Sequence, residues 1–218
     1  LREAVKRRAV QGEKPSFTNE DLRFRQLTMR EQPAIQAVVF LLLDVSGSMS
    51  ERDRQLAKTF FFWAVQGLRR QYHHLDTVFV AHTTEAWEFS EQEFFEVSGS
   101  GGTVASAGLA KVREIIDARF SPARYNIYLF YASDGDNYTA DRTQAETELG
   151  AIAEQANYCG YLEVSASAQR ELVSETGTLF KSMTDAGKAV GSFPLGRAED
   201  VWNAVRHFFQ QQAEAPAP

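Results

Sequence analysis

The turn after the first apolar segment carries three oxygen-bearing side chains at alternating positions. Asp44, Ser46 and Ser48 lie where the apolar run Gln36–Asp44 ends. Alternate side chains at the tip of a strand can converge on one point, and Gly47 permits the sharp bend between the two serines. Carboxylate and hydroxyl oxygens without His or Cys form a hard donor set, which suits Mg²⁺, Mn²⁺ or Ca²⁺ rather than Zn²⁺. The spacing therefore predicts a site for a divalent cation.

Two other loops supply oxygen donors of the same kind. Thr103 follows the glycine-rich segment Ser98–Gly102 and opens a predicted helix, and Asp134 comes shortly after the apolar run Tyr125–Ala132. If this run is a strand beside the first one, Asp134 and Asp44 face each other at the ends of neighbouring parallel strands. We therefore expect five side chains from three loops to surround one cation.

Residues next to these five are candidates to support them, namely Asp136, Gly47 and Gly102. Asp136 either makes the site more acidic or is only part of a polar loop. Taken alone, the Asp-x-Ser-x-Ser motif could be a strand-terminating turn, because Asp and Ser are common in turns. The presence of Thr103 and Asp134 on suitable elements favours the metal-binding interpretation.

Strand-like and helix-like segments alternate along the chain. This order predicts an α/β fold with a doubly wound, mostly parallel sheet and helices on both faces. Ligand sites of such folds lie beyond the carboxyl ends of the strands. Strands are predicted at residues 36–44, 76–81, 125–132 and 158–164, with one or two short strands within 85–97 and an edge strand at 179–183; helices are predicted at 52–72, 104–119, 141–157 and 199–211.

Composition and charge exclude several classes of protein. With 44% apolar residues in 218, the chain can bury a core and is not generally disordered. A formal net charge of −6 argues against a nucleic-acid binder. The single cysteine, Cys159, excludes a disulfide framework. The run Ala37–Leu43 is too short to cross a membrane, and no signal peptide is visible.

The uneven distribution of charge suggests three segments. Residues 1–33 hold eight Lys and Arg against five Asp and Glu, and we expect them to form a basic arm with a helix start at Thr18. This arm would be the last part of a missing N-terminal region. Residues 34–212 are expected to form the α/β domain, and residues 213–218 a flexible tail.

For several side chains outside the predicted site, a structural role is the simplest interpretation. The aromatic run Phe60–Trp63 falls in the middle of a predicted helix, so we expect it, together with Trp202, to pack in the core. Cys159 is also expected in the core, His82 is expected to be a structural hydrogen-bonding residue near the site, and His207 is expected to be exposed.

The order of the candidate ligands resembles the metal-ion-dependent adhesion site of von Willebrand factor A domains. The resemblance implies a Rossmann-like sheet of six strands. It also implies that Ser46, Ser48 and Thr103 bind the ion directly, while Asp44 and Asp134 act through water. The remaining coordination position is then left for a carboxylate of a partner protein, because neutral hydroxyls quench the charge of Mg²⁺ only in part.

Six short segments carry a closer resemblance through their joint order and spacing, namely Phe40–Met49, Phe60–Trp63, Ala81–Glu85, Ser100–Thr103, Arg124–Tyr128 and Ser133–Asn137. From about residue 21 to 209 the chain resembles the bacterial YeaH/YhbH family, whose members carry a C-terminal von Willebrand A-type domain. The resemblance implies a cytoplasmic protein of stress adaptation or sporulation that works beside an AAA-type serine protein kinase and has no established activity.

The sequence leaves three functions open, of which the first is favoured. It is a metal-dependent protein-interaction module that captures an acidic side chain and binds neither nucleic acid nor membrane. The second is a phosphatase or phosphotransferase of haloacid-dehalogenase type with Asp44 as nucleophile, although Ser46 stands where such enzymes need an acid. The third is a scaffold whose metal is purely structural. We expect the chain not to be an enzyme.

Overall fold

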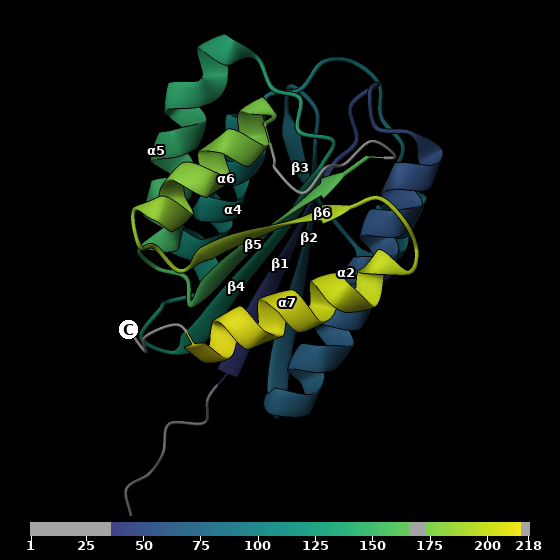
Figure 1. Ribbon diagram of the computed structural model, residues 1–218. Coiled ribbons are helices and arrows are strands. Elements are labelled where there is room, and N and C mark those ends of the chain that lie inside the picture. Colours follow the sequence, from purple (N-terminus) through teal and green to yellow (C-terminus); the bar gives the residue numbers. More distant parts are fainter. Residues whose placement is uncertain (1–35, 166–172, 215–218) are drawn as a thin grey trace, which may run out of the picture. The chain divides into compact units, whose positions relative to one another are not determined.

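The computed structural model describes residues 36–165 and 173–214, with side chains up to residue 210 (Figure 1). The basic arm expected at residues 1–33, with its helix start at Thr18, lies outside the described residues. The last helix continues to Glu214, two residues into the segment expected to be a tail. Among the described residues, no helix combines the length and the apolar character that a membrane span needs.

The domain is built on a six-stranded sheet in the order β3-β2-β1-β4-β5-β6. All neighbouring pairs are parallel except β2 and β3, which are antiparallel. The strands are β1 (Gln36–Asp44), β2 (His74–His82), β3 (Ala86–Phe89), β4 (Tyr125–Ser133), β5 (Tyr158–Val164) and β6 (Val190–Leu195). The predicted doubly wound, mostly parallel α/β fold is therefore confirmed.

Helices cover both faces of the sheet (Figure 1). One apolar cluster joins the sheet to α2 (Glu51–Gln71), α3 (Glu91–Glu96) and α7 (Asp200–Glu214). The other joins it to α4 (Ala105–Arg119), α5 (Arg142–Ala153) and α6 (Glu175–Asp185), where a short 3-10 turn at Thr139–Asp141 precedes α5.

The central strand β1 is almost continuously apolar because both of its faces are buried. Val39, Leu41 and Leu43 belong to the cluster under α2 and α7. Val38, Phe40 and Leu42 belong to the cluster under α4 to α6, because successive side chains of a strand point to opposite faces. Two neighbours flank β1: β2, which follows it in the chain, and β4, which comes later. The strand order therefore reverses between β1 and β4, where a ligand site is expected.

One predicted strand is wrong. The segment Leu179–Met183 lies within α6, whose start is capped by Ser174. Its buried residues Leu179, Phe180 and Met183 follow helical spacing, and the edge position is taken by β6 instead. Within residues 85–97, one strand, β3, is present, which confirms the prediction of one or two short strands there. The rest forms α3, because Ser90 and Glu93 complete a capping box that starts a helix.

The prediction that the whole aromatic run packs in the core is also wrong. Phe60 and Phe61 are fully buried, whereas Phe62 is 49% and Trp63 37% exposed. Consecutive residues of a helix point about 100° apart, so four in a row cannot all face the sheet. Trp202, expected in the core, is 54% exposed. Its ring centroid lies 5.0 Å from that of Trp63, so the two indoles cover each other in part.

Of the two side chains Cys159 and His207, only the first has the burial that the sequence predicts. Cys159 is buried, as predicted. His207, predicted to be exposed, is half-buried, because its ring packs against Phe193 and Phe208, each 5.3 Å away between centroids. This burial lowers the pKa of His207.

The buried thiol predicts a pH dependence of stability. Burial raises the pKa of Cys159 to about 12, so above about pH 9 the unfolded chain loses a proton that the native state keeps. The free energy of unfolding therefore falls as pH rises. Relative to Cys159→Ala, we expect wild type to lose up to about 1.4 kcal/mol per pH unit between about pH 9 and 11. Urea unfolding of both proteins at several pH values measures this, and a constant difference would contradict it.

Candidate functional site

The loop after β1 holds its three oxygen-bearing side chains close together. The Asp44 carboxylate is fully buried, and its Oδ1 accepts a hydrogen bond of 2.8 Å from the backbone N–H of Ser46. Ser46 is also fully buried, and its Oγ lies 3.1 Å from the Oγ of the exposed Ser48. Of these three side chains, Asp44 and Ser46 are therefore buried, and the hydroxyl of Ser48 lies at the surface.

The end of β4 fixes the second oxygen of Asp44. The hydroxyl of Ser133 donates to Asp44 Oδ2 over 3.1 Å, and it accepts a bond of 3.0 Å from the N–H of Gly135. The orientation of the Asp44 carboxylate is thus set from two loops. The sequence analysis gave Ser133 no role. Only its position at the end of a strand beside β1 could have signalled it, and that pairing is visible only in the fold.

Asp134 joins the same group through Ser48. The Ser48 hydroxyl lies near enough to the Asp134 carboxylate to lower its pKa, and the N–H of Asp136 donates to Asp134 Oδ1 over 3.1 Å. Burial raises the pKa of Asp134. These two interactions oppose this shift, and the negative charges of Asp44 and Asp136 add to it. Partly buried negative charge at this point is therefore costly without a cation.

Thr103 is buried, with 6% of its surface exposed, and it lines the same hollow as Ser48. This hollow has a volume of about 330 Å³ and is also bordered by Asp136. The loop before Thr103 is tied to the first loop, since the N–H of Gly47 donates to the carbonyl of Gly101 over 3.0 Å. Of the five predicted ligands, Ser48 and Thr103 therefore border this hollow, whereas Asp44, Ser46 and Asp134 do not line it.

The loop after β4 also caps the helix that follows Thr103. Asn137 Oδ1 accepts from the N–H of Ala105 over 3.0 Å, and Asp141 accepts from the N–H of Ser106 over 2.9 Å. These bonds satisfy free N–H groups at the start of α4. They also join the second and third loops, so the position of Thr103 depends on both.

Gly102 and Gly47, expected to support the ligands, have different surroundings. A Cβ atom at Gly102 would collide with the hydroxyl of Tyr138, so this exposed ring would have to move to admit a side chain there. A Cβ atom at Gly47 would meet the carbonyl of Gly101 at 3.4 Å, an ordinary contact. Asp136 is exposed at the rim of the hollow and orients Asp134 through its backbone N–H.

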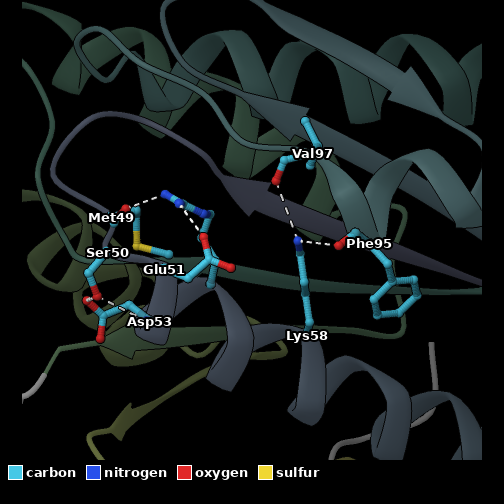
Figure 2. Close-up of polar contacts among 8 residues, drawn as sticks. Met49, Ser50, Glu51, Asp53, Lys58, Phe95 and Val97 are labelled. Atoms are coloured by element: carbon cyan, nitrogen blue, oxygen red, sulfur yellow. Dashed lines mark hydrogen bonds and ion pairs between the residues drawn. The ribbon is translucent and has the colours of Figure 1, made fainter.

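The first turns of α2 brace two of the loops (Figure 2). Ser50 caps the helix by accepting from the N–H of Asp53, and Arg54 donates to the carbonyl of Met49 at the end of the first loop. One turn on, Lys58 donates to the carbonyls of Phe95 at 2.8 Å and Val97 at 3.5 Å, which precede the glycine-rich segment.

The charge of Lys58 is held inside the protein. Lys58 is only 7% exposed. Burial lowers the pKa of its ammonium group, the charge of Arg54 lowers it further, and Glu51 opposes the shift. Because two backbone carbonyls accept from this ammonium, it fixes the end of α3 and the start of the loop that leads to Thr103.

His82 has a structural position next to the site. Its ring is fully buried, its Nδ1 lies 3.2 Å from the carbonyl of Thr83, and its centroid lies 5.4 Å from that of Tyr131. Its backbone carbonyl accepts from the N–H of Val45 over 2.9 Å, which connects β2 to the first loop. The imidazole does not border the hollow that Ser48 and Thr103 line.

The donor set fits a hard cation. Within the described part of the chain, no three His, Cys, Asp or Glu side chains form a cluster suited to a metal. A cation here must take hydroxyl oxygens together with the two carboxylates. Mg²⁺ suits such a set, because it keeps several waters and needs few protein carboxylates.

Solved structures share this architecture, and they define the class of fold. The PilB minor pilin from Streptococcus sanguinis superimposes with a TM-score of 0.63 at 12% identity, over 86% of this chain and 64% of that chain. The protein BatB from Bacteroides thetaiotaomicron gives a TM-score of 0.56 at 15% identity, over 82% of this chain and 99% of that chain. The fold is therefore an α/β fold like that of von Willebrand A-like proteins.

The sequence places the chain in a family. Residues 1–212 match the model described as "Protein of unknown function (DUF444)", and the chain belongs to this family. UPF0229 proteins of Shouchella clausii and Bacillus cereus are 36% and 38% identical to it, over 97% and 96% of this chain. The chain spans about half the length of these curated relatives, 53% of each.

Proposed function

We propose that this domain is a metal-dependent protein-interaction module and not an enzyme. Ser46, Ser48 and Thr103 would hold a Mg²⁺ ion, with Asp44 and Asp134 behind them. The same oxygen donors could also bind Mn²⁺ or Ca²⁺. Bound there, the ion supplies a positive charge that neutral hydroxyls quench only in part, and an Asp or Glu of a partner protein completes its coordination.

One observation carries this proposal. The Ser48 hydroxyl lies 3.1 Å from Ser46 Oγ, lowers the pKa of the Asp134 carboxyl group, and borders the hollow that Thr103 also lines. These neighbours support a cation site at a point where a protein side chain could enter from solvent. Asp44 is already oriented by Ser46 and Ser133, so the chain needs little rearrangement to accept a cation.

The partner is proposed from chemistry first and from family resemblance second. The cation selects an acidic side chain. The resemblance to the YeaH/YhbH family supports a partner in a bacterial stress or sporulation kinase system in the cytoplasm. An AAA-type serine protein kinase, or a protein associated with it, is then the candidate.

The test is affinity capture of partner proteins from a lysate of the source organism, with Mg²⁺ or with EDTA. Wild type should retain partners only with Mg²⁺, and Asp44→Ala and Ser46→Ala should retain none. Equal capture in EDTA, or by the two variants, would refute the proposal. Calorimetric titration of the purified chain with Mg²⁺ establishes separately whether the metal binds.

Two other outcomes would assign the site differently. If Mg²⁺ raises the melting temperature but capture does not depend on it, the metal is structural, because an ion that binds only the native state stabilises it. If the chain hydrolyses p-nitrophenyl phosphate and Asp44→Asn abolishes this activity, the site is that of a phosphatase. Ser46 argues against the second outcome, since a hydroxyl is a poor proton donor at neutral pH.

The bond from Ser133 to Asp44 predicts an effect on metal affinity. Ser133→Ala removes a donor to a buried carboxylate without adding volume. Groups that orient metal ligands typically contribute about 10–100-fold to metal affinity, so we expect a loss of this size for Mg²⁺ in calorimetry. Ser121→Ala, an exposed serine in the turn before β4, is the control and should bind as wild type does. Unchanged affinity in Ser133→Ala would mean that Asp44 needs no such support.

A further inference from the structure

A second pocket lies on the other side of the glycine-rich loop from the proposed metal site. Its volume is about 550 Å³, within the range of sites that bind small ligands or side chains. Apolar side chains and carboxylates both line it, together with backbone of the loop. The residues that matter are Trp87, Phe89, Val97, Glu88, Glu93 and Ser100.

Neighbouring residues of the glycine-rich loop border the two pockets. Ser100 lines the second pocket, and Gly101 lines the hollow at the metal site. The first loop holds this part of the chain, because the carbonyl of Gly101 accepts from the N–H of Gly47, and Gly99 packs so closely on the carbonyl of Val45 that no side chain fits there. We therefore expect one short peptide segment to reach both pockets.

Trp87 gives the second pocket an aromatic wall. It lies on β3, the short edge strand, and 46% of its surface is exposed. An exposed indole next to a pocket offers its π face to a ligand, and cations are attracted to that face. Phe89, two residues further along β3, also lines the pocket.

The charge around this pocket is negative. Two carboxylates, Glu88 and Glu93, are the charged side chains among the described residues that line it. Arg119 reaches this region from α4 but is paired with Glu88 at 2.7 Å, and the ammonium of Lys58 is turned inward to two carbonyls. Glu93 stays ionised, because hydrogen bonds from Ser90 lower its pKa. The pocket thus combines an aromatic wall with a carboxylate that has no ion-pair partner among the described residues.

We propose that this pocket receives a Lys or Arg side chain of the same partner segment whose Asp or Glu reaches the metal. The proposal rests on the proposed function for the acidic half of that segment. The cation lies against Trp87 and is attracted by Glu93. The recognised motif is then a basic and an acidic residue a few positions apart, and the negative charge of this region favours its approach.

Synthetic peptides of the form acetyl-Arg-(Gly)n-Asp-amide, with n from one to five, test the proposal against the whole chain. Each has a partner peptide with citrulline, a neutral analogue of Arg, and one with Asn in place of Asp. Binding is followed by NMR through the indole N–H signals of Trp63, Trp87 and Trp202, in Mg²⁺ and in EDTA. For at least one spacer we expect the Arg peptide to bind three- to tenfold more tightly than its citrulline partner and to shift the Trp87 signal.

Variants separate the second pocket from the metal site. Trp87→Leu and Glu93→Gln should reduce the preference for Arg over citrulline to less than twofold, while calorimetric affinity for Mg²⁺ stays unchanged. Trp202→Leu replaces an equally exposed tryptophan on α7 and should leave the preference intact.

The possible failures are distinguishable. Mg²⁺-dependent binding of the Asp peptides without a preference for Arg would overturn the second pocket and leave the metal site standing. A preference for Arg that persists when Asp is replaced by Asn, with no effect of EDTA, would refute the metal site and retain the cation pocket. No binding of any peptide at millimolar concentration would overturn both.

Discussion

Replacing Ser48 by alanine is expected to lower the affinity for Mg²⁺ by at least about tenfold and to abolish metal-dependent binding of a partner. The hydroxyl that is lost touches Ser46 and Asp134 and faces the hollow. The fold should be unaffected, because Ser48 is exposed and contributes no core volume. The free energy of unfolding should remain within about 0.5 kcal/mol of wild type.

Two measurements check this expectation. Calorimetric titration with Mg²⁺ gives the affinity, and urea unfolding in EDTA gives the stability without the contribution of bound metal. Ser121→Ala serves as the matched serine replacement at the opposite edge of the sheet. Wild-type affinity for Mg²⁺ in Ser48→Ala would remove this hydroxyl from the ligand set, and with it the main support for the proposed function.

Phe61→Ala is expected to destabilise the domain by about 3–5 kcal/mol. The ring is fully buried in the cluster between the sheet and α2, with its centroid 6.1 Å from those of both Phe60 and Phe94. Alanine leaves a cavity there, since a close-packed core can only partly collapse onto the lost volume. Loss of this size is a large part of the stability of a typical domain.

The neighbouring residue provides the control. Phe62→Ala removes the same side chain from the next position of α2, but 49% of Phe62 is exposed. We expect a cost of about 1 kcal/mol or less. Urea unfolding of the two variants at one pH measures the difference. Equal losses would mean that the two rings are equally buried, which would contradict the orientation of α2.

Ser48→Ala and Phe61→Ala together separate function from folding. The first should lose metal binding and keep stability, and the second should lose stability. If Ser48→Ala were as unstable as Phe61→Ala, the proposed metal site would be part of the core, and the position of Ser48 at the surface would be wrong.

The central strand, the fold class and the order of the candidate ligands could all be predicted from the sequence. The run Gln36–Asp44 is almost continuously apolar, which is typical of a strand covered on both faces. Its side chains do contribute to both apolar clusters, so this strand could be predicted from local composition. The positions of Asp44, Ser46 and Ser48 then follow as well, because the turn begins where the apolar run stops. These features depend on neighbours in the chain, and such neighbours are visible in the sequence.

Contacts between residues far apart in the chain became visible only in the folded domain. The bond from Ser133 to Asp44 joins residues 89 positions apart and exists because β4 pairs with β1. The exposure of Trp63 and Trp202 and the pocket beside Trp87 likewise depend on how helices and an edge strand pack on the sheet. The physical reason is that hydrophobic periodicity specifies which face of an element is buried, whereas contacts between loops depend on the order in which strands pair.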